Sequence, residues 1–282
     1  MTLRANLAGV TVGEGYPVAL IGVLNVSPES FYPWSIYGAP DDLLRAAGAM
    51  VEAGAQILDV GAMSTAPYLP TRISEAEEAD RLASAVHPLS TKLGAPISAD
   101  TTRSNPACAA LEAGATIIND VSGLTADPAM AGLVAKRGAG LIVMARERGG
   151  EKTGSPVDLV RDLLEESLRI GSQAGVPAER IVVDPGIGFF RRQRLPWSEW
   201  DTAVLANLRT LHALGRPLCV GVSRKSFLGA ILGHNDPRDR LPGSLAATAL
   251  AVVNGAHLIR THDVAETREA VRVAEAIRGA QR

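Results

Sequence analysis

The sequence predicts a single-domain α/β protein of the (β/α)8 TIM-barrel class, and three observations lead to this prediction. Eight short apolar runs alternate with amphipathic stretches along the chain, an order typical of a parallel sheet with helices outside it. The length of 282 residues falls in the range of one such barrel. Apolar residues make up 46% of the chain and charged residues 21%, so the chain can bury a large core. We therefore expect one domain over residues 1–282.

Each apolar run has the length and composition of a buried parallel strand. The predicted strands are Val18–Leu24, Gln56–Val60, Pro96–Ala99, Thr116–Asn119, Gly140–Met144, Ile181–Asp184, Leu218–Val222 and His257–Arg260. Apolar spacings of three and four predict helices over Asp41–Ala53, Ser74–Leu93, Asn105–Ala113, Val157–Ala174, Glu199–Leu214, Leu241–Asn254 and Val264–Arg278. The irregular stretches Tyr32–Pro40 and Phe190–Trp200 are expected to be loops over the site.

A short pattern recurs at residues 52–59, 112–119 and 254–260 and supports the barrel. In each copy a glycine closes a helix, and the strand that follows ends in a polar residue: Asp59, Asn119 or Arg260. Because parallel barrel strands end at one mouth, these polar side chains are expected to emerge together there. We expect the chemistry at that mouth.

Most of the predicted strands end in polar residues, although a polar side chain is unfavourable inside an apolar barrel. They are Asn25, Asp59, Asp100, Asn119, Asp184, Lys225 and Arg260. A single one is also explained as a capping or turn residue, but seven at one face predict a polar site. Asp100, Asn119 and Asp184 can accept from an amino group and a ring N–H, and the amide also donates to a carbonyl. A heterocycle with an amidine-like edge suits them.

Positive charge gathers on the last two strands, where many barrels hold phosphate. Lys225 lies in one segment, and Arg260 with His262 in the other. The alternative for these residues is a surface ion pair.

Composition excludes several classes of function. The formal net charge is −2 and no dense Lys/Arg run occurs, which argues against nucleic acid or an anionic membrane as partner and favours a small molecule. Cys108 and Cys219 lack metal-site spacing and are expected to be buried free thiols. The amino terminus does not resemble a signal peptide and no apolar run approaches ~18 residues, so we expect a cytoplasmic protein.

Seven segments resemble the dihydropteroate synthase family in order and spacing over nearly all of the chain. They are Gly22–Phe31, Gln56–Gly61, Ser98–Thr101, Ile118–Gly123, Val183–Phe189, Ser223–Gly229 and Arg260–Val264. The resemblance implies a condensation in folate biosynthesis: 6-hydroxymethyl-7,8-dihydropterin pyrophosphate loses pyrophosphate, and the amine of p-aminobenzoate takes its place on the methylene carbon. It also implies a homodimer.

The resemblance further implies roles for individual residues. Asp100, Asn119, Asp184 and Lys225 match positions that hold the pterin. Asn25 matches a position that holds Mg2+, and Arg260 and His262 match positions around the leaving pyrophosphate. Thr65, Phe189, Ser226, Arg260 and His262 match the side where p-aminobenzoate and pyrophosphate bind, and Lys225, Arg260 and His262 are the expected catalytic residues. Preorganised charge, rather than a protein nucleophile, would then supply the rate.

The chain departs from the family pattern mainly in two loops. Tyr32–Gly38 replaces a Ser-Asp-Gly-Gly segment and lacks its carboxylate, and Met63–Tyr68 keeps Thr65 but lacks the family's arginine. Arg146, Arg191 and Arg192 are candidates to replace that charge. Loss of one charge-assisted contact to the leaving group costs ~2–4 kcal/mol in the transition state, about two to three decades in rate.

Three hypotheses follow. The first is an active dihydropteroate synthase, favoured by Asn25, Lys225, Arg260 and His262. The second is a related methyltransferase that acts on a reduced folate or pterin and passes the methyl group to a corrinoid partner. The third is a paralogue that binds a pterin without catalysis, with the altered loops as its mark.

Overall fold

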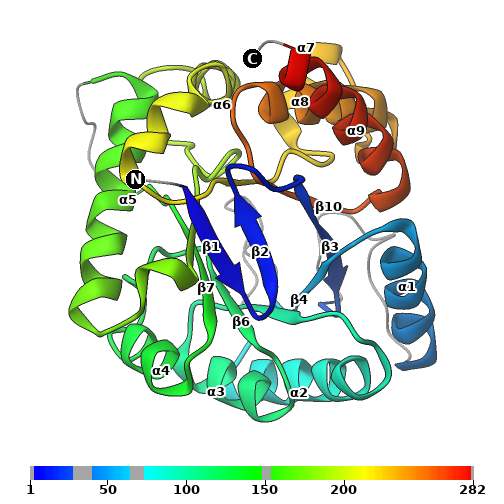
Figure 1. The fold of residues 1–282 in the computed structure, drawn as a ribbon, viewed down its shortest axis with the longest axis vertical. Coiled ribbons are helices and arrows are strands. Elements are labelled where there is room, and N and C mark those ends of the chain that lie inside the picture. The colour runs from blue at the N-terminus through cyan, green and yellow to red at the C-terminus, as the bar shows by residue number, and fades with distance from the viewer. Residues whose placement is uncertain (1–2, 28–39, 64–72, 148–153, 281–282) are drawn as a thin grey trace.

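The computed structural model describes residues 3–27, 40–63, 73–147 and 154–280, and it confirms the predicted (β/α)8 barrel (Figure 1). The parallel strands are β3 (Ala19–Asn25), β4 (Ile57–Gly61), β5 (Ile97–Asp100), β6 (Ile117–Asp120), β7 (Gly140–Met144), β8 (Ile181–Asp184), β9 (Cys219–Val220) and β10 (Leu258–Thr261). They pair in the order β8-β7-β6-β5-β4-β3-β10-β9. A parallel bridge between Val183 and Leu218 joins β8 to the start of β9 and closes the sheet. Each predicted strand agrees with the structure within two residues at either end.

Helices lie outside the barrel, as the chain order requires (Figure 1). The predicted ones are confirmed as α1 (Pro40–Ala53), α2 (Glu75–Lys92), α3 (Ser104–Glu112), α5 (Pro156–Gln173), α6 (Trp197–Ala206), α8 (Leu241–Val253) and α9 (Val264–Ala280). The predicted helix 199–214 ends early, because residues Leu208–Leu214 form a separate 3-10 helix. Serine caps fix two of the starts: Ser74 accepts from the Glu77 amide at 3.1 Å and Ser155 from the Asp158 amide at 3.3 Å.

Two short helices were not predicted, α4 (Met130–Arg137) and α7 (Ser226–Leu232). Both are too short to show a clear period of 3.6 residues in sequence. The helix α7 follows β9 directly and begins next to Lys225, so its position bears on the site. Among the described residues, no helix combines the length and hydropathy needed to cross a membrane.

An antiparallel hairpin that the sequence analysis missed covers the amino-terminal end of the barrel (Figure 1). Its strands are β1 (Arg4–Leu7) and β2 (Val10–Gly13), and Ala8 and Gly9 turn between them with positive φ. Leu7 and Val12 are fully buried and pack in one cluster with barrel residues such as Ile117. The hairpin therefore closes one end of the barrel and leaves the carboxyl ends of the strands for the site.

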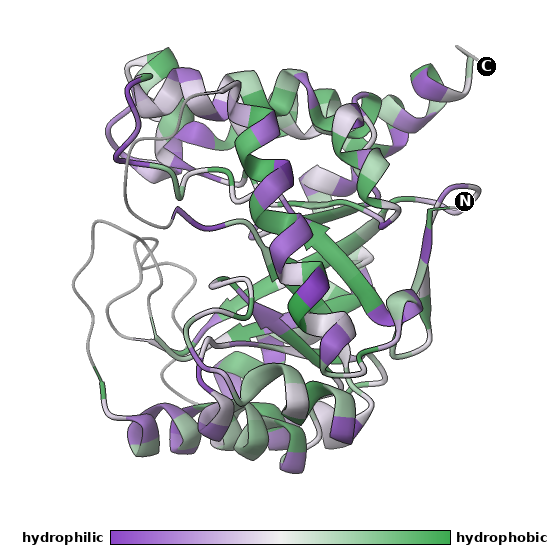
Figure 2. Ribbon diagram, turned by 90° about the vertical axis from the view of Figure 1, so that its left-hand side faces the viewer, coloured by the Kyte–Doolittle hydropathy of each residue, from purple (hydrophilic) through white to green (hydrophobic). Residues whose placement is uncertain are grey.

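The inner face of the barrel changes from apolar to polar along the strands. The apolar cluster inside the barrel includes Ile57, Ile117, Val182 and Leu258. Their neighbours along each strand, such as Leu58 and Ile118, belong to the outer cluster that packs against the helices. Because strand side chains alternate with a period of two, the next inward position on these four strands falls on a polar residue. Figure 2 shows mainly hydrophobic strands surrounded by helices in which hydrophilic and hydrophobic residues are mixed.

Candidate active site

Four inward polar residues form the layer above the apolar cluster: Asp59 on β4, Asn119 on β6, Asp184 on β8 and Arg260 on β10. Asp100 joins this layer, because it ends β5 and pairs in register with Asn119. All of these side chains are buried except Arg260, which is partly exposed. The strand ends thus bring together the acids and the amide that the sequence analysis selected. Asp59 was noted there only as a strand end and was not assigned to the site.

Arg260 is the centre of a buried ion-pair network. Its Nε donates to Asp59 Oδ2 at 2.6 Å and its Nη2 to Asp100 Oδ2 at 3.0 Å. Asn119 Nδ2 donates to the same Asp59 oxygen at 3.2 Å. The other carboxylate oxygens, Asp59 Oδ1 and Asp100 Oδ1, are buried and have no hydrogen-bond partner in the described part of the chain. Such acceptors are costly unless a ligand or water supplies donors.

Burial and neighbouring charges shift the pKa values of this network. Burial raises the pKa of Asp100 to about 7, against the opposing effect of Arg260, and the nearby charge of Asp59 adds to the rise. For Arg260, burial alone would lower the pKa, but Asp59 and Asp100 hold it above its ordinary value. Asp100 therefore changes protonation near neutral pH while Arg260 stays charged.

A second pair of opposite charges lies on β8 and after β9. Burial raises the pKa of Asp184, while Lys225 and the Gly186 amide, which donates to Asp184 Oδ1 at 2.7 Å, oppose the rise. Burial lowers the pKa of Lys225 to about 8, although Asp184 acts in the other direction. The Lys225 ammonium donates to the Ile187 carbonyl and lies 5.0 Å from the centre of the Phe189 ring.

His262 lies beside this network but does not bring the positive charge that the sequence analysis expected. Burial, followed by the charges of Arg260 and Arg224, lowers the pKa of His262 to about 3. Its Nδ1 lies 2.9 Å from the Ser223 hydroxyl. At neutral pH the imidazole is therefore neutral, and of these two candidates only Arg260 is a cation.

A strained residue supports the segment that carries Lys225 and Ser226. Arg224 has a positive φ of 55°, which a residue with a side chain rarely adopts. Its guanidinium forms two contacts to Asp263, at 2.8 and 2.5 Å, and its amide donates to Ser244. These charge-assisted bonds offset the strain and fix the start of α7.

The predicted p-aminobenzoate residues Phe189 and Ser226 both lie next to Lys225: the Phe189 ring centre is 5.0 Å from the ammonium, and Ser226 follows Lys225 in sequence. Arg191 Nη2 donates to Ser226 Oγ at 2.6 Å, and the Arg191 guanidinium lies 4.1 Å from the centre of the Trp197 ring. Of the three arginines proposed to replace the missing loop charge, Arg146 and Arg192 are exposed, and Arg191 is the half-buried one. Its Nε also donates to the Gly188 carbonyl at 3.2 Å, so Arg191 contacts both Ser226 and the turn before Phe189.

Some predictions concern segments outside the described residues. These are Thr65, the first loop 32–38 and most of the second loop. The predicted loop Phe190–Trp200 is partly wrong, because Phe190 and Trp200 are buried and stack with ring centres 4.9 Å apart. The helix α6 begins within that stretch, at Trp197.

Asn25 is the candidate Mg2+ ligand. It ends β3, is partly exposed, and its Oδ1 lies close to Gly61 at the end of β4, near Asp100. Among the residues that the structure describes, no group of three or more His, Cys, Asp or Glu side chains is placed to hold a metal ion. One amide oxygen fits Mg2+ that arrives with a diphosphate, since Mg2+ usually keeps waters and substrate phosphates as ligands.

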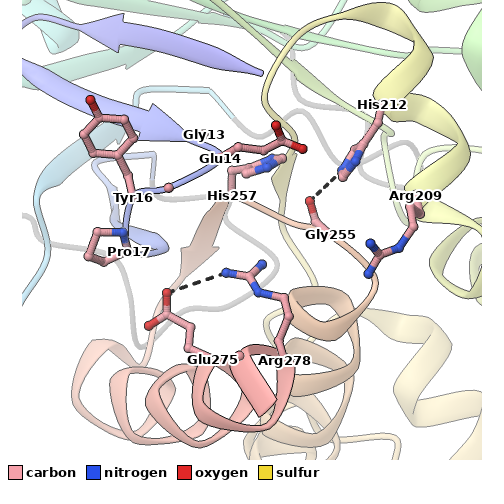
Figure 3. A pocket seen from close by; sticks show the side chains of 12 residues that line it. Gly13, Glu14, Tyr16, Pro17, Arg209, His212, Gly255, His257, Glu275 and Arg278 are labelled. Carbon is pink, nitrogen blue, oxygen red and sulfur yellow. Dashed lines mark hydrogen bonds and ion pairs between the residues drawn. The ribbon is translucent and has the colours of Figure 1, made fainter. Parts of the chain in front are cut away.

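A hollow of about 370 Å3 at the opposite end of the barrel does not contribute to this site (Figure 3). Its side chains Arg209, His212 and Arg278 contact main-chain carbonyls of residues 252, 253 and 255 at 2.9 to 3.1 Å. These contacts satisfy the carboxyl end of α8 and the turn after it. These three side chains therefore have a structural role at the end of α8.

Comparison with known proteins identifies the family. The family model described as pterin binding enzyme matches residues 21–262. A curated dihydropteroate synthase from Synechocystis is 36% identical over 265 residues, which span 92% of this chain and 89% of that protein. The chain belongs to the dihydropteroate synthase family.

Solved structures of the dihydropteroate synthase family share the fold. The enzyme from Coxiella burnetii in complex with pteroic acid is 33% identical, with a TM-score of 0.87 over 99% of this chain and 100% of that one. The enzyme from Xanthomonas albilineans with 4-aminobenzoic acid is 31% identical, with a TM-score of 0.86 over 98% of both chains. Family membership confirms the resemblance drawn from the seven segments and the predicted transferase class.

Proposed function

We propose that the protein condenses 6-hydroxymethyl-7,8-dihydropterin pyrophosphate with p-aminobenzoate and releases pyrophosphate, a step of folate biosynthesis. The observation that carries this proposal is the layer of Asp59, Asp100, Asn119 and Asp184, with buried carboxylate oxygens that lack donors in the described chain. A pterin offers an amino group and ring N–H groups as donors. Met144, inward on β7 next to Asp184, gives the slot an apolar wall for a flat ring.

The carboxylates also suit the charge that develops during the reaction. As the C–O bond to the diphosphate breaks, the methylene carbon and the ring gain positive character. The carboxyl groups of Asp100 and Asp184 are held in place there, and in their ionised forms they stabilise this positive charge without reorganisation. The amine nitrogen forms the new C–N bond as the C–O bond breaks, and the proton that it loses passes to water.

The negative charge of the leaving diphosphate would be stabilised by a cation, Arg260, and by hydrogen bonds. Arg260 is held in position by Asp59 and Asp100, and neutral His262 donates or accepts through its ring nitrogens. Asn25 would hold the Mg2+ that accompanies the diphosphate, and Mg2+ bound there supplies neutralisation of the departing charge. Lys225 and Ser226, with Phe189, form the side for p-aminobenzoate.

One pair of measurements tests the function against its alternatives. We expect pyrophosphate release when both substrates are present, and calorimetric binding of the pterin alone. A pterin-binding protein without catalysis would bind without release, and a methyltransferase would release no pyrophosphate from this substrate.

Asp184→Asn is the variant that tests the pterin slot. The amide removes the charge and presents N–H donors where the pterin also presents donors, so we expect pterin binding to weaken at least about 100-fold, or ~3 kcal/mol. Asp162→Asn, on the exposed face of α5, is the matched control and should bind as the unchanged protein does. Wild-type affinity in Asp184→Asn would place the ring elsewhere.

Metal removal tests the role assigned to Asn25. We expect a chelator to abolish pyrophosphate release, Mg2+ to restore it, and Asn25→Ala to need a higher Mg2+ concentration for half-maximal rate. Pterin binding measured by calorimetry should change little. Full activity in the chelator would refute a metal requirement.

We also propose a homodimer. Large apolar side chains that are more than a third exposed gather on the last three helices: Ile231, Leu232, Leu250, Val273 and Ile277. The helices α7, α8 and α9 lie together on one side of the barrel (Figure 1). Apolar groups of this size concentrated on neighbouring helices favour a protein partner, and a second copy is the simplest one.

A further inference from the structure

Asp201 is a fully buried carboxylate that the mechanism above does not use. It lies on α6, outside the strand layer, and none of its surface is exposed. Its Oδ1 accepts from the Gly188 amide at 2.8 Å, while its Oδ2 is buried without a hydrogen-bond partner in the described chain. A buried charge with one unsatisfied oxygen costs stability, so its presence calls for a reason other than packing.

The bond to Gly188 fixes the turn that holds Lys225. Gly188 has a φ of +86°, and a Cβ there would meet Lys225 Cδ at 3.1 Å. The preceding residue, Ile187, supplies the carbonyl that receives the Lys225 ammonium. The following residue, Phe189, places its ring over the same ammonium. The amide held by Asp201 therefore lies between the two contacts that orient Lys225.

The charge of Asp201 also acts on Lys225. Burial raises the pKa of Asp201 to about 6, against the Gly188 amide and the charges of Lys225 and Arg191. Burial lowers the pKa of Lys225, and the charges of Asp184 and then Asp201 act to raise it. Arg260 lowers this pKa further, and Cys219 has the smallest effect of these groups, in the raising direction. At pH 7 Asp201 is ionised and helps to keep the buried ammonium charged.

We propose that Asp201 is a positioning residue for Lys225: it holds the Gly188 amide so that the Ile187 carbonyl and the Phe189 ring meet the ammonium, and its carboxylate stabilises the charge there. The consequence for pterin and p-aminobenzoate binding rests on the function proposed above. The effect on Lys225 itself does not.

Lysine NMR tests the charge directly and needs no turnover. The chain has four lysines, Lys92, Lys136, Lys152 and Lys225, so 13Cε labelling gives four signals, and Lys225→Arg identifies the fourth. We expect Lys225 to titrate near pH 8, and Asp201→Asn to lower its midpoint by roughly half a pH unit to one unit. The control Asp162→Asn should leave it unchanged. An unchanged midpoint in Asp201→Asn would refute the electrostatic part of the proposal.

Comparison of two substitutions tests the positioning part. Asn keeps an oxygen for the Gly188 amide and Ala does not, so we expect Asp201→Ala to weaken pterin binding about tenfold more than Asp201→Asn. Equal affinities in the two variants would refute it. Should Asp201→Ala fail to fold, as judged by circular dichroism, Asp201→Ser, which also lacks the reach to Gly188, takes its place. Absence of pyrophosphate release in the unchanged protein would refute only the proposed reaction. The effect of Asp201 on Lys225 would still be tested by NMR, because that measurement needs no turnover.

Discussion

At the scale of the residue, the site is built from groups whose ordinary protonation is altered by burial. The ion pair between Arg260 and the two acids Asp59 and Asp100 is the clearest case, because it places three charged groups inside a barrel. A buried pair of this kind is poor evidence for stability, since an apolar substitute of similar volume often does as well. The proposed binding of a pterin gives this network a role other than stability.

The pH dependence of the reaction follows from two of these groups. Asp100, with a pKa raised to about 7, loses its negative charge and presents an O–H donor to the ligand once it is protonated, so kcat/KM should fall as the pH drops below about 7. Lys225, with a pKa lowered to about 8, loses its charge above that pH, so kcat/KM should fall again. We expect a narrow maximum between these values in a pyrophosphate-release assay.

Lys225→Arg provides the control, because a guanidinium keeps its proton throughout the range. The alkaline decline should disappear in this variant while the acid decline stays. A flat profile of the unchanged protein from pH 6 to 9 would contradict the assignment.

At the scale of the element, the hairpin of β1 and β2 is the part of the fold that the sequence analysis failed to predict. Each strand has four residues, and the pattern in β1 alternates exposed and buried positions over too few residues to be distinctive. Its role becomes visible only in space, where Leu7 packs against Gly140 and Ile117 at the closed end of the barrel.

Leu7→Ala tests that role. The side chain is fully buried, so truncation should lower the free energy of unfolding by about 2–5 kcal/mol in urea denaturation. Leu195→Ala, at a surface turn, should change it by less than about 0.5 kcal/mol. Because the hairpin and the site lie at opposite ends, kcat/KM of the folded protein should be unchanged. A loss of activity without a loss of stability would show that the hairpin acts on the site.

Prediction from sequence succeeded where the pattern of apolar and polar residues was unambiguous. Buried strands such as Gly140–Met144 are continuous apolar runs, and strand ends such as Asp184 are conspicuous because a charge follows Val183. It could not assign Asp59 a partner, since the contact to Arg260 joins residues 201 positions apart. It overlooked Asp201 because a carboxylate in α6 resembles any exposed helix residue until burial is known. The charge of His262 was predicted wrongly for the same reason, as burial decides it.

At the scale of the whole molecule, the two ends of the barrel have separate tasks. The amino-terminal end is closed by the hairpin and by apolar side chains, and the carboxyl end carries the polar layer. A substitution at the closed end is therefore expected to act on stability, and one at the other end on binding and rate. The side of α7, α8 and α9 belongs to neither end, which leaves its exposed apolar groups unexplained within one chain.

Leu250→Glu tests the proposed dimer at that face. Leu250 is 62% exposed on α8, so a charge there costs the folded monomer little but would be buried without a partner in a two-fold interface, at a cost of several kcal/mol. We expect analytical ultracentrifugation to find a dimer for the unchanged protein and a monomer for this variant. Asp162→Lys on α5, away from the apolar face, should remain a dimer. Since the strand-end layer comes from one chain, the monomeric variant should keep its affinity for the pterin. If the unchanged protein is itself a monomer, the dimer proposal is refuted.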